Sequence, residues 1–175
     1  MDVILQNLEE LDVYYCNSLV TLIPPSACFQ NLTILTVERC GELLQLLSSS
    51  TAKSLVGLKE MRIRFCESMT KVVADDEGAI TEDIEIINFS KLKSLELCYL
   101  SELTSFCSWN YTFNFPCLER LSVQNCPKMN TFASGVVLAP MLREIELDYE
   151  DYYCKGDVNT SMQQIHKELV CIDIL

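Results

Sequence analysis

Hydrophobic residues return at fixed distances along most of this chain. Counted from a first leucine, apolar residues stand at offsets 3, 5, 11 and 14, and cysteine stands at offset 8 in four copies. The pattern reads L-x-x-L-x-L-x-x-C-x-x-L-x-x-L, and six copies, the last one degenerate, follow one another at steps of 24 to 34 residues. The first leucines of these copies are Leu8, Leu32, Leu58, Leu92, Leu118 and Leu142.

This spacing has a direct structural meaning. Alternation with period two inside L-x-L suits a short strand with one buried face. A repeat length of roughly 20–29 residues is typical of leucine-rich repeats. Only the stacking of neighbouring copies buries the apolar stripe of each copy. We therefore predict an α/β fold, a leucine-rich-repeat solenoid with a curved parallel sheet on its concave face and an irregular or short helical convex side.

Two stretches of the convex side are distinctive. Residues 48–55 place Ser and Thr ahead of Leu55, and we predict a short helical turn there. Residues 73–88 form an insertion, for which we predict a solvated loop. The alternative, a divalent-cation loop, is disfavoured because the D-x-[DN]-x-[DN]-G spacing is absent. The acidic residues of this insertion are Asp75, Asp76, Glu77, Glu82, Asp83 and Glu85.

The tail departs from the repeats. We predict two parts of the chain, a domain of about six repeats over residues 1–150 and a C-terminal cap with a short helix over residues 151–175. Val158, Met162, Ile165 and Leu169 are spaced as one face of a helix, and Asn159 or Thr160 is predicted to cap its start. His166 is predicted to lie on the surface. The first strand begins almost at Met1, which suggests a fragment or the end of a longer array.

Composition and charge exclude several partners. The net charge of −12 repels nucleic-acid phosphates and anionic membrane surfaces. No apolar run approaches the ~18–20 residues of a membrane-spanning helix, and the first 20 residues lack the features of a signal peptide. We therefore predict a soluble cytoplasmic protein that binds neither nucleic acid nor membrane.

The ten cysteines indicate packing rather than chemistry. The chain has no CxxC pair and one histidine, which disfavours a metal site. Neither a metal nor a cofactor is predicted. Recurrence at one repeat position favours buried, reduced thiols, with redox or metal chemistry as the open alternative. The structural cysteine positions are Cys16, Cys40, Cys66 and Cys126.

Positions between the buried leucines are predicted to face solvent on the concave sheet. Aromatic residues recur near one end of these strands, and arginines cluster at the centre; both types are enriched at interface hot spots. The alternative is that some aromatic rings only pack against neighbouring turns. An anionic segment or another domain of the same protein would suit the arginines. The predicted protein-binding residues are Tyr14, Tyr15, Arg39, Arg62, Arg64, Phe65, Tyr99, Arg120 and Tyr149.

The repeats and the segments between them resemble the C-terminal leucine-rich-repeat region of plant coiled-coil nucleotide-binding disease resistance proteins. The resemblance rests on LEELDVYYCNSLVTLIPPS, on LKEMRIRFCESMTKVV, and on FPCLERL with NCPKM. It implies a module that senses pathogen effectors or guarded host proteins, or that holds a nucleotide-binding domain inactive. The chain lacks a P-loop and a coiled-coil segment, so nucleotide binding is not assigned to it.

Other classes of function fit less well. An enzyme needs a tuned acid–base pair or a cysteine with a histidine partner, and we predict neither an active site nor a small-molecule substrate. An extracellular leucine-rich-repeat receptor ectodomain is the main alternative, because the chain carries four N-x-[ST] sequons. A truncated remnant without its own signalling activity is a further alternative.

Overall fold

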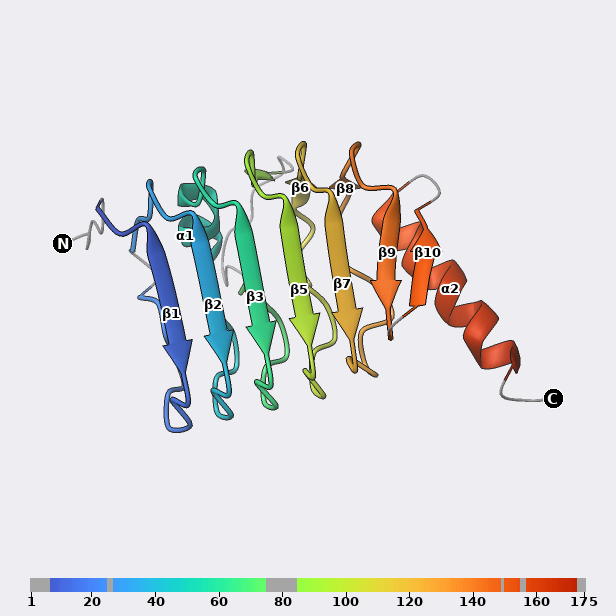
Figure 1. Ribbon diagram of the computed structural model, residues 1–175, viewed down its shortest axis with the longest axis horizontal. Helices are drawn as coiled ribbons and strands as arrows, with labels where there is room; N and C mark the ends of the chain where they lie inside the picture. Colours follow the sequence, from blue (N-terminus) through green and yellow to red (C-terminus); the bar gives the residue numbers. More distant parts are fainter. Residues whose placement is uncertain (1–6, 25–26, 75–84, 149, 155–156, 173–175) are drawn as a thin grey trace.

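One large sheet runs the length of the molecule (Figure 1). The structure, a computed structural model, describes residues 7–24, 27–74, 85–148, 150–154 and 157–172. Seven strands pair in parallel except at the last step, where β10 runs antiparallel to β9. In sheet order they are β1 (Glu10–Tyr14), β2 (Ile34–Glu38), β3 (Glu60–Arg64), β5 (Ser94–Cys98), β7 (Arg120–Gln124), β9 (Glu144–Leu147) and β10 (Glu150–Tyr153). The predicted leucine-rich-repeat solenoid is confirmed.

The register of the sheet follows the sequence repeat. Leu35 lies beside Met61 and Met61 beside Leu95, so residues at one repeat offset form a row across the strands. The inward-facing residues of β2 are fully buried, whereas Leu11 and Val13 of β1 are only partly buried. Each repeat therefore removes its apolar stripe from water against the next repeat, which is the main stabilising contribution.

The return segments build a second, smaller sheet on the convex side. It consists of β4 (Ile86–Asn88), β6 (Thr112–Asn114) and β8 (Val137–Leu138), paired in parallel. The predicted helical turn is confirmed as α1 (Ser49–Ser54), which lies against β4. The Ser48 hydroxyl caps it by accepting the Thr51 N–H at 3.0 Å. The small sheet was not predicted, because strands of two or three residues are too short to show a periodic pattern.

Aromatic rings pack against the small sheet in one buried cluster. Phe106 stacks on Phe132 with ring centroids 4.9 Å apart and meets Phe113 of β6 edge-on at 5.4 Å. A close backbone approach accompanies this cluster: a Cβ atom added to Gly135 would lie 1.9 Å from the Tyr111 carbonyl oxygen. Only glycine fits at that position.

The acidic insertion is described only at its ends. Residues 75–84, which make up most of the predicted loop, lie outside the described residues. At its C-terminal end, the Glu85 carboxylate accepts a hydrogen bond from Lys53 Nζ at 2.7 Å, which links the insertion to α1.

The C-terminal end of the solenoid is covered by β10 and α2 (Val158–Ile172) (Figure 1). Val158, Met162 and Ile165 bury one face of this helix; the side chain of Leu169 is not described. The predicted helix cap is wrong, since the Asp157 carboxylate, not Asn159 or Thr160, accepts the backbone N–H of Thr160 at 3.0 Å.

Asn159 instead joins the helix to the repeats. Its Oδ1 accepts the Ala133 N–H at 2.9 Å and the Thr131 hydroxyl at 3.2 Å, and its Nδ2 donates to the Gly135 carbonyl at 2.9 Å. The surface position predicted for His166 is corrected as well. His166 is half-buried, and its Nε2 is shielded from solvent.

Candidate functional site

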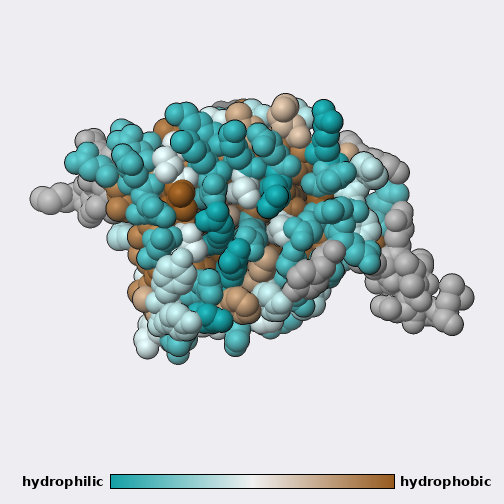
Figure 2. Space-filling model, viewed as in Figure 1, coloured by the Kyte–Doolittle hydropathy of each residue, from teal (hydrophilic) through white to brown (hydrophobic). Residues whose placement is uncertain are grey.

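The exposed face of the seven-stranded sheet, which we call the concave face, is mostly hydrophilic (Figure 2). Residues at one offset stand in rows across it. In one row Thr36, Arg62, Glu96 and Ser122 are register neighbours, and in the next Glu38 lies beside Arg64. Short side chains in these rows are covered by longer neighbours, so Thr36 and Ser122 are buried although they point away from the core.

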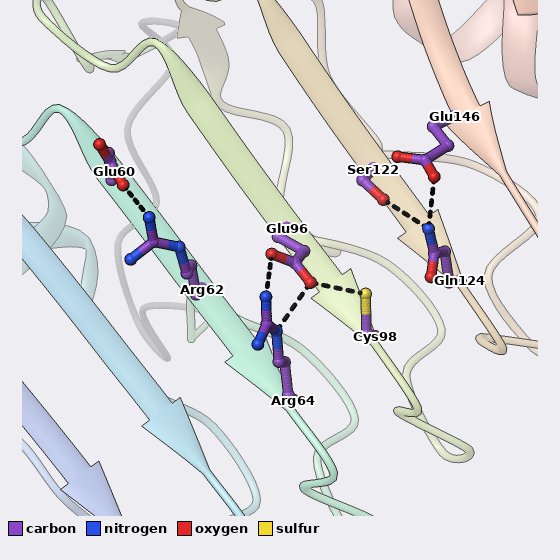
Figure 3. Close-up of polar contacts among 8 residues, drawn as sticks. All are labelled: Glu60, Arg62, Arg64, Glu96, Cys98, Ser122, Gln124 and Glu146. Carbon is purple, nitrogen blue, oxygen red and sulfur yellow. Dashed lines mark hydrogen bonds and ion pairs between the residues drawn. The ribbon is translucent and has the colours of Figure 1, made fainter. Parts of the chain in front are cut away.

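At the centre of this face Arg64 and Glu96 form a bidentate ion pair across β3 and β5 (Figure 3). Both nitrogen–oxygen distances are 2.7 Å, and the Cys98 thiol donates to the same carboxylate at 3.2 Å. Burial opposes ionisation of Glu96, but the hydrogen bonds from Arg64 and Cys98 outweigh it and lower the pKa of Glu96. The hydrogen bond to Glu96 raises the pKa of Arg64. This predicted arginine is therefore charge-compensated within the protein.

The other predicted arginines are placed differently. Arg62 pairs with Glu60 on its own strand (Figure 3). Arg39 pairs with Glu38 at 3.2 Å. Arg120 is exposed, and no carboxylate among the described residues pairs with it. The structure thus brings the four arginines onto one side of the sheet without making a shared free cationic patch.

A row of unusual backbone conformations marks the end of each parallel strand. Six non-glycine residues there have positive φ, between 47° and 58°. Each takes the place one residue after a five-residue strand, or the equivalent place after β9. Side chains larger than Asn or Asp rarely adopt this conformation, and it costs on the order of 1–3 kcal/mol per residue. We call this row the strand-end ladder: Tyr15, Arg39, Phe65, Tyr99, Asn125 and Asp148.

Backbone hydrogen bonds hold the ladder in place. The N–H groups of Tyr15, Arg39 and Phe65 each donate at 3.0 Å to a carbonyl at the end of the neighbouring strand. Tyr99 does so at 2.8 Å. The strained conformation of these four residues persists because the sheet supplies such a bond at each of them, while the Asn125 N–H donates instead to the Asp148 carboxylate.

The ladder side chains contact one another in sequence. The guanidinium of Arg39 lies 5.1 Å from the ring centroid of Tyr15 and 5.0 Å from that of Phe65, which is cation–π distance. Phe65 stacks on Tyr99 with centroids 4.5 Å apart and an interplanar angle of 12°. Arg39 also donates to the Tyr15 hydroxyl at 2.7 Å. Three of the predicted aromatic residues and one predicted arginine thus form a single surface feature.

The two remaining predicted aromatic residues lie elsewhere. Tyr14 is exposed at the end of β1, one residue before the ladder. Tyr149 lies outside the described residues, and Asp148 occupies the ladder position of the last repeat. Sequence reasoning missed the roles of Asn125 and Asp148. Asn125 stands directly before the cysteine offset and Asp148 stands two residues before it, and Asn and Asp both favour positive φ more than other residues do.

The thiols at the cysteine offset close the turn beneath the ladder. The Cys66 and Cys126 thiols each donate to the carbonyl of the residue two positions earlier at 3.4 Å, and Cys40 does so at 3.7 Å. Burial raises the pKa of Cys66 and of Cys126 to about 11, and it raises the pKa of Cys40 as well. Cys16 makes the same contact at 3.5 Å but is exposed in the first repeat.

A depression adjoins the C-terminal half of the ladder. Its volume is about 460 Å³. Two aromatic rings and two carboxylate side chains contribute to its wall, and the turn around Cys126 completes it. The lining residues are Phe65, Glu67, Tyr99, Ser101, Asn125, Cys126, Pro127 and Asp148.

Two kinds of site are not found in the part of the chain that the structure describes. No group of three or more His, Cys, Asp or Glu side chains could hold a metal ion there. No helix within the described ranges is long and apolar enough to cross a membrane. What the described surface offers is a side-chain array on a rigid sheet, which is suited to contact with another molecule.

Residues 21–147 match the family described as plant disease resistance protein RPS2-like, leucine-rich repeats. This chain belongs to that family. A probable disease resistance protein of Arabidopsis thaliana is 32% identical over 137 residues, which cover 73% of this chain and 14% of that protein. A second from the same plant is 31% identical over 124 residues, with 71% and 12% covered.

The family membership makes this chain a leucine-rich-repeat module of plant defence. Leucine-rich-repeat regions of resistance proteins generally mediate protein interactions, which agrees with the side-chain array described above. The chain spans about a seventh of the length of the curated relatives that it matches. No solved structure matches it.

Proposed function

We propose that this chain is a non-catalytic interaction module in plant defence that acts inside the cell. In this role it senses a pathogen effector or a guarded host protein, or it holds the nucleotide-binding domain of a receptor inactive. The binding surface is the concave face together with the strand-end ladder. The proposal includes the residues predicted from the sequence, among them Tyr15, Arg39, Phe65, Tyr99 and Arg120.

The strand-end ladder is the observation that carries this proposal. Bulky side chains occupy four consecutive positions that favour Asn, Asp or Gly, and none of the six positions holds glycine. Tyr15 is 64% exposed and Tyr99 is 39% exposed, so burial in the core does not explain these residues. Strained, exposed aromatic residues on a rigid scaffold are typical of binding surfaces.

A non-catalytic, intracellular role agrees with the thiols. The nine cysteines whose side chains the structure describes are free, and those buried at the cysteine offset have raised pKa values, which makes them poor nucleophiles. A chain with so many unpaired cysteines suits a reducing compartment. This reading opposes the alternative of an extracellular receptor ectodomain.

The test is association between this chain and the nucleotide-binding region of a related disease resistance protein, measured by calorimetry. Arg62, Arg64 and Arg120 are changed together to Glu, and a second variant carries Tyr15→Asn with Tyr99→Asn. Asn suits positive φ, so the second variant keeps the backbone while it removes the rings. Loss of binding in both variants, with unchanged circular dichroism, supports the proposed surface.

The control is Lys91→Glu, which reverses one exposed charge in the turn before β5, away from the ladder. Binding that survives both the arginine and the tyrosine variants contradicts this surface. Binding lost equally in the Lys91→Glu control contradicts it too, because a charge reversal away from the proposed surface then has the same effect.

A further inference from the structure

The chemistry of the strand-end ladder changes abruptly along its length. From the N-terminal end its side chains run Tyr15, Arg39, Phe65 and Tyr99, all in ring or guanidinium contact. After Tyr99 the ladder continues with Asn125 and Asp148, which are short. The depression of about 460 Å³ lies there, bounded by the rings of Phe65 and Tyr99. Its volume is within the range of small-ligand sites, about 300–1,000 Å³.

The depression is acidic. Glu67 and Asp148 contribute its two carboxylates, both on exposed residues. Asp148 accepts the backbone N–H of Asn125 at 2.7 Å, and no cationic side chain among the described residues pairs with either carboxylate. Lys128, near the depression in sequence, pairs instead with Glu102 at 2.5 Å.

We infer that this depression binds an arginine side chain of a partner protein. A guanidinium can stack on an aromatic ring while its N–H groups reach carboxylates, and a ring beside two carboxylates offers both contacts. The ladder already contains this arrangement, because Arg39 lies between Tyr15 and Phe65. An arginine from the partner continues the same alternation beyond Tyr99.

Charge decides against other occupants. An anionic group would meet Glu67 and Asp148 and the net charge of −12 of the whole chain. An apolar side chain would cover two carboxylates without compensating them, which is unfavourable. A lysine meets the charge requirement but lacks the planar face that stacks, so the site favours arginine over lysine.

This inference rests on the proposed interaction function and deepens it by naming the chemistry of the partner. It also distinguishes the central arginines of the concave face from the acidic depression beside the strand-end ladder. The central arginines of the concave face are largely compensated by Glu60 and Glu96. The free charge near the aromatic ladder is therefore negative, and the basic residue of the contact comes from the partner.

The test follows the backbone amides of the full chain by nuclear magnetic resonance during titration with a peptide. The probe is the blocked pentapeptide acetyl-GGRGG-amide, and its comparison replaces arginine with citrulline, which keeps the shape but not the charge. We expect saturable shifts of the amides of Phe65, Tyr99, Asn125 and Asp148. We expect citrulline to bind at least tenfold more weakly and lysine to bind at an intermediate level.

A charge-neutral variant locates the site. Glu67→Gln with Asp148→Asn removes both carboxylate charges, and Asn at 148 retains an oxygen that accepts the Asn125 N–H. We expect at least tenfold weaker binding of the arginine peptide. The control pair Glu10→Gln with Glu42→Gln, both exposed in the first two repeats, changes the net charge equally and should leave binding within twofold.

Three results would overturn the inference: no saturable shift, equal binding of the citrulline peptide, or equal loss in the control pair. None of them depends on a receptor domain. A chain that binds the arginine peptide but no nucleotide-binding region would uphold this site and contradict only that candidate partner. A chain that binds the nucleotide-binding region but not the arginine peptide would contradict this arginine site and uphold that candidate partner.

Discussion

The two sheets of this solenoid are built from different kinds of sequence. The large sheet is made from the regular part of each repeat, with aliphatic residues in rows and a register that never slips. The small sheet is made from the irregular return segments, with strands of two or three residues. The first depends on a repeated pattern, and the second depends on a few particular residues.

Side-chain packing also differs between regular and irregular parts of the repeats. At offset 14 the second repeat has Leu46 and the fourth has Phe106, and both are buried. The rings of Phe113, Phe115 and Phe132 surround Phe106 in one network of ring contacts, whereas Leu46 at the equivalent position is aliphatic and has no ring to take part in such a network. The lesson is that the repeat determines which positions are buried, while local composition determines how specific the packing is. The predictions below test that difference, from the largest expected effect to the smallest.

Gly135→Ala should have the largest effect. The added Cβ would overlap the backbone of Tyr111, which cannot move without breaking the pairing of β6 with β8. We expect a loss of unfolding free energy on the order of 5 kcal/mol, measured by urea denaturation. Gly41→Ala is the control, because its Cβ would make an ordinary contact at 3.6 Å with Asn17 Oδ1. Equal stability of the two variants would refute a specific role for the small sheet.

Phe106→Ala should destabilise the chain by about 4 kcal/mol through loss of buried area and of ring contacts. The change at the equivalent position, Leu46→Ala, should cost about 3 kcal/mol. Chemical denaturation of both variants measures the difference. A larger loss for Leu46→Ala would show that the aromatic cluster adds nothing to the repeat pattern.

Asn159→Ala should cost about 2 kcal/mol, because three hydrogen bonds between α2 and the fifth repeat are lost together. Hydrogen exchange should then rise first in α2 and β8, at the C-terminal end. Thr160→Ala, which removes only a hydroxyl contact with Asp157, should cost less than 1 kcal/mol. Faster exchange spread evenly over all the repeats would contradict a local fastening role.

Ionisation of the buried thiols should give the smallest change in stability, and this change appears only at high pH. The ordinary cysteine pKa is 9.0, and Cys66 and Cys126 have pKa values of about 11 in the folded chain. The pKa of each thiol is higher in the folded chain than in the unfolded chain. The contribution of these two protonated thiols to the free energy of unfolding is therefore complete below pH 9 and is lost as pH rises toward 11. Denaturation at increasing pH should show this decline.

Thiol alkylation at pH 8 provides the corresponding kinetic measurement. Cys16 and Cys117 are exposed and should react first, while Cys66 and Cys126 should react only as the chain opens. Mass spectrometry of the alkylated chain reads each site separately. Protection of Cys117 by a disulfide would contradict the reducing compartment and favour an extracellular receptor.

The repeat offsets also predicted some features of the binding surface, while particular side-chain contacts determined others. Offsets counted from the leucines placed Tyr15, Phe65 and Tyr99 near one strand end, and the structure shows them in one ladder. The same counting predicted a central cluster of arginines that would suit an anionic segment, whereas acidic side chains compensate Arg62 and Arg64 in the structure. Offsets give the row of a residue, but ion pairing depends on side-chain conformation, as for Arg62 and Glu60 on one strand, and on neighbours from other repeats, as for Arg64 and Glu96.

By itself, the sequence determined the architecture. A repeated L-x-x-L-x-L with cysteine three residues later leaves one way to bury every apolar stripe, the stacked parallel sheet, and it fixes which residues share a row. Only the tertiary structure decided the small sheet, the fastening by Asn159, the ion pairs and the depression beside Tyr99. Most of these arise from contacts between repeats, as the Arg64–Glu96 pair does across 32 residues and the Gln124–Glu146 hydrogen bond across 22 residues, and the pattern within one repeat does not encode such contacts.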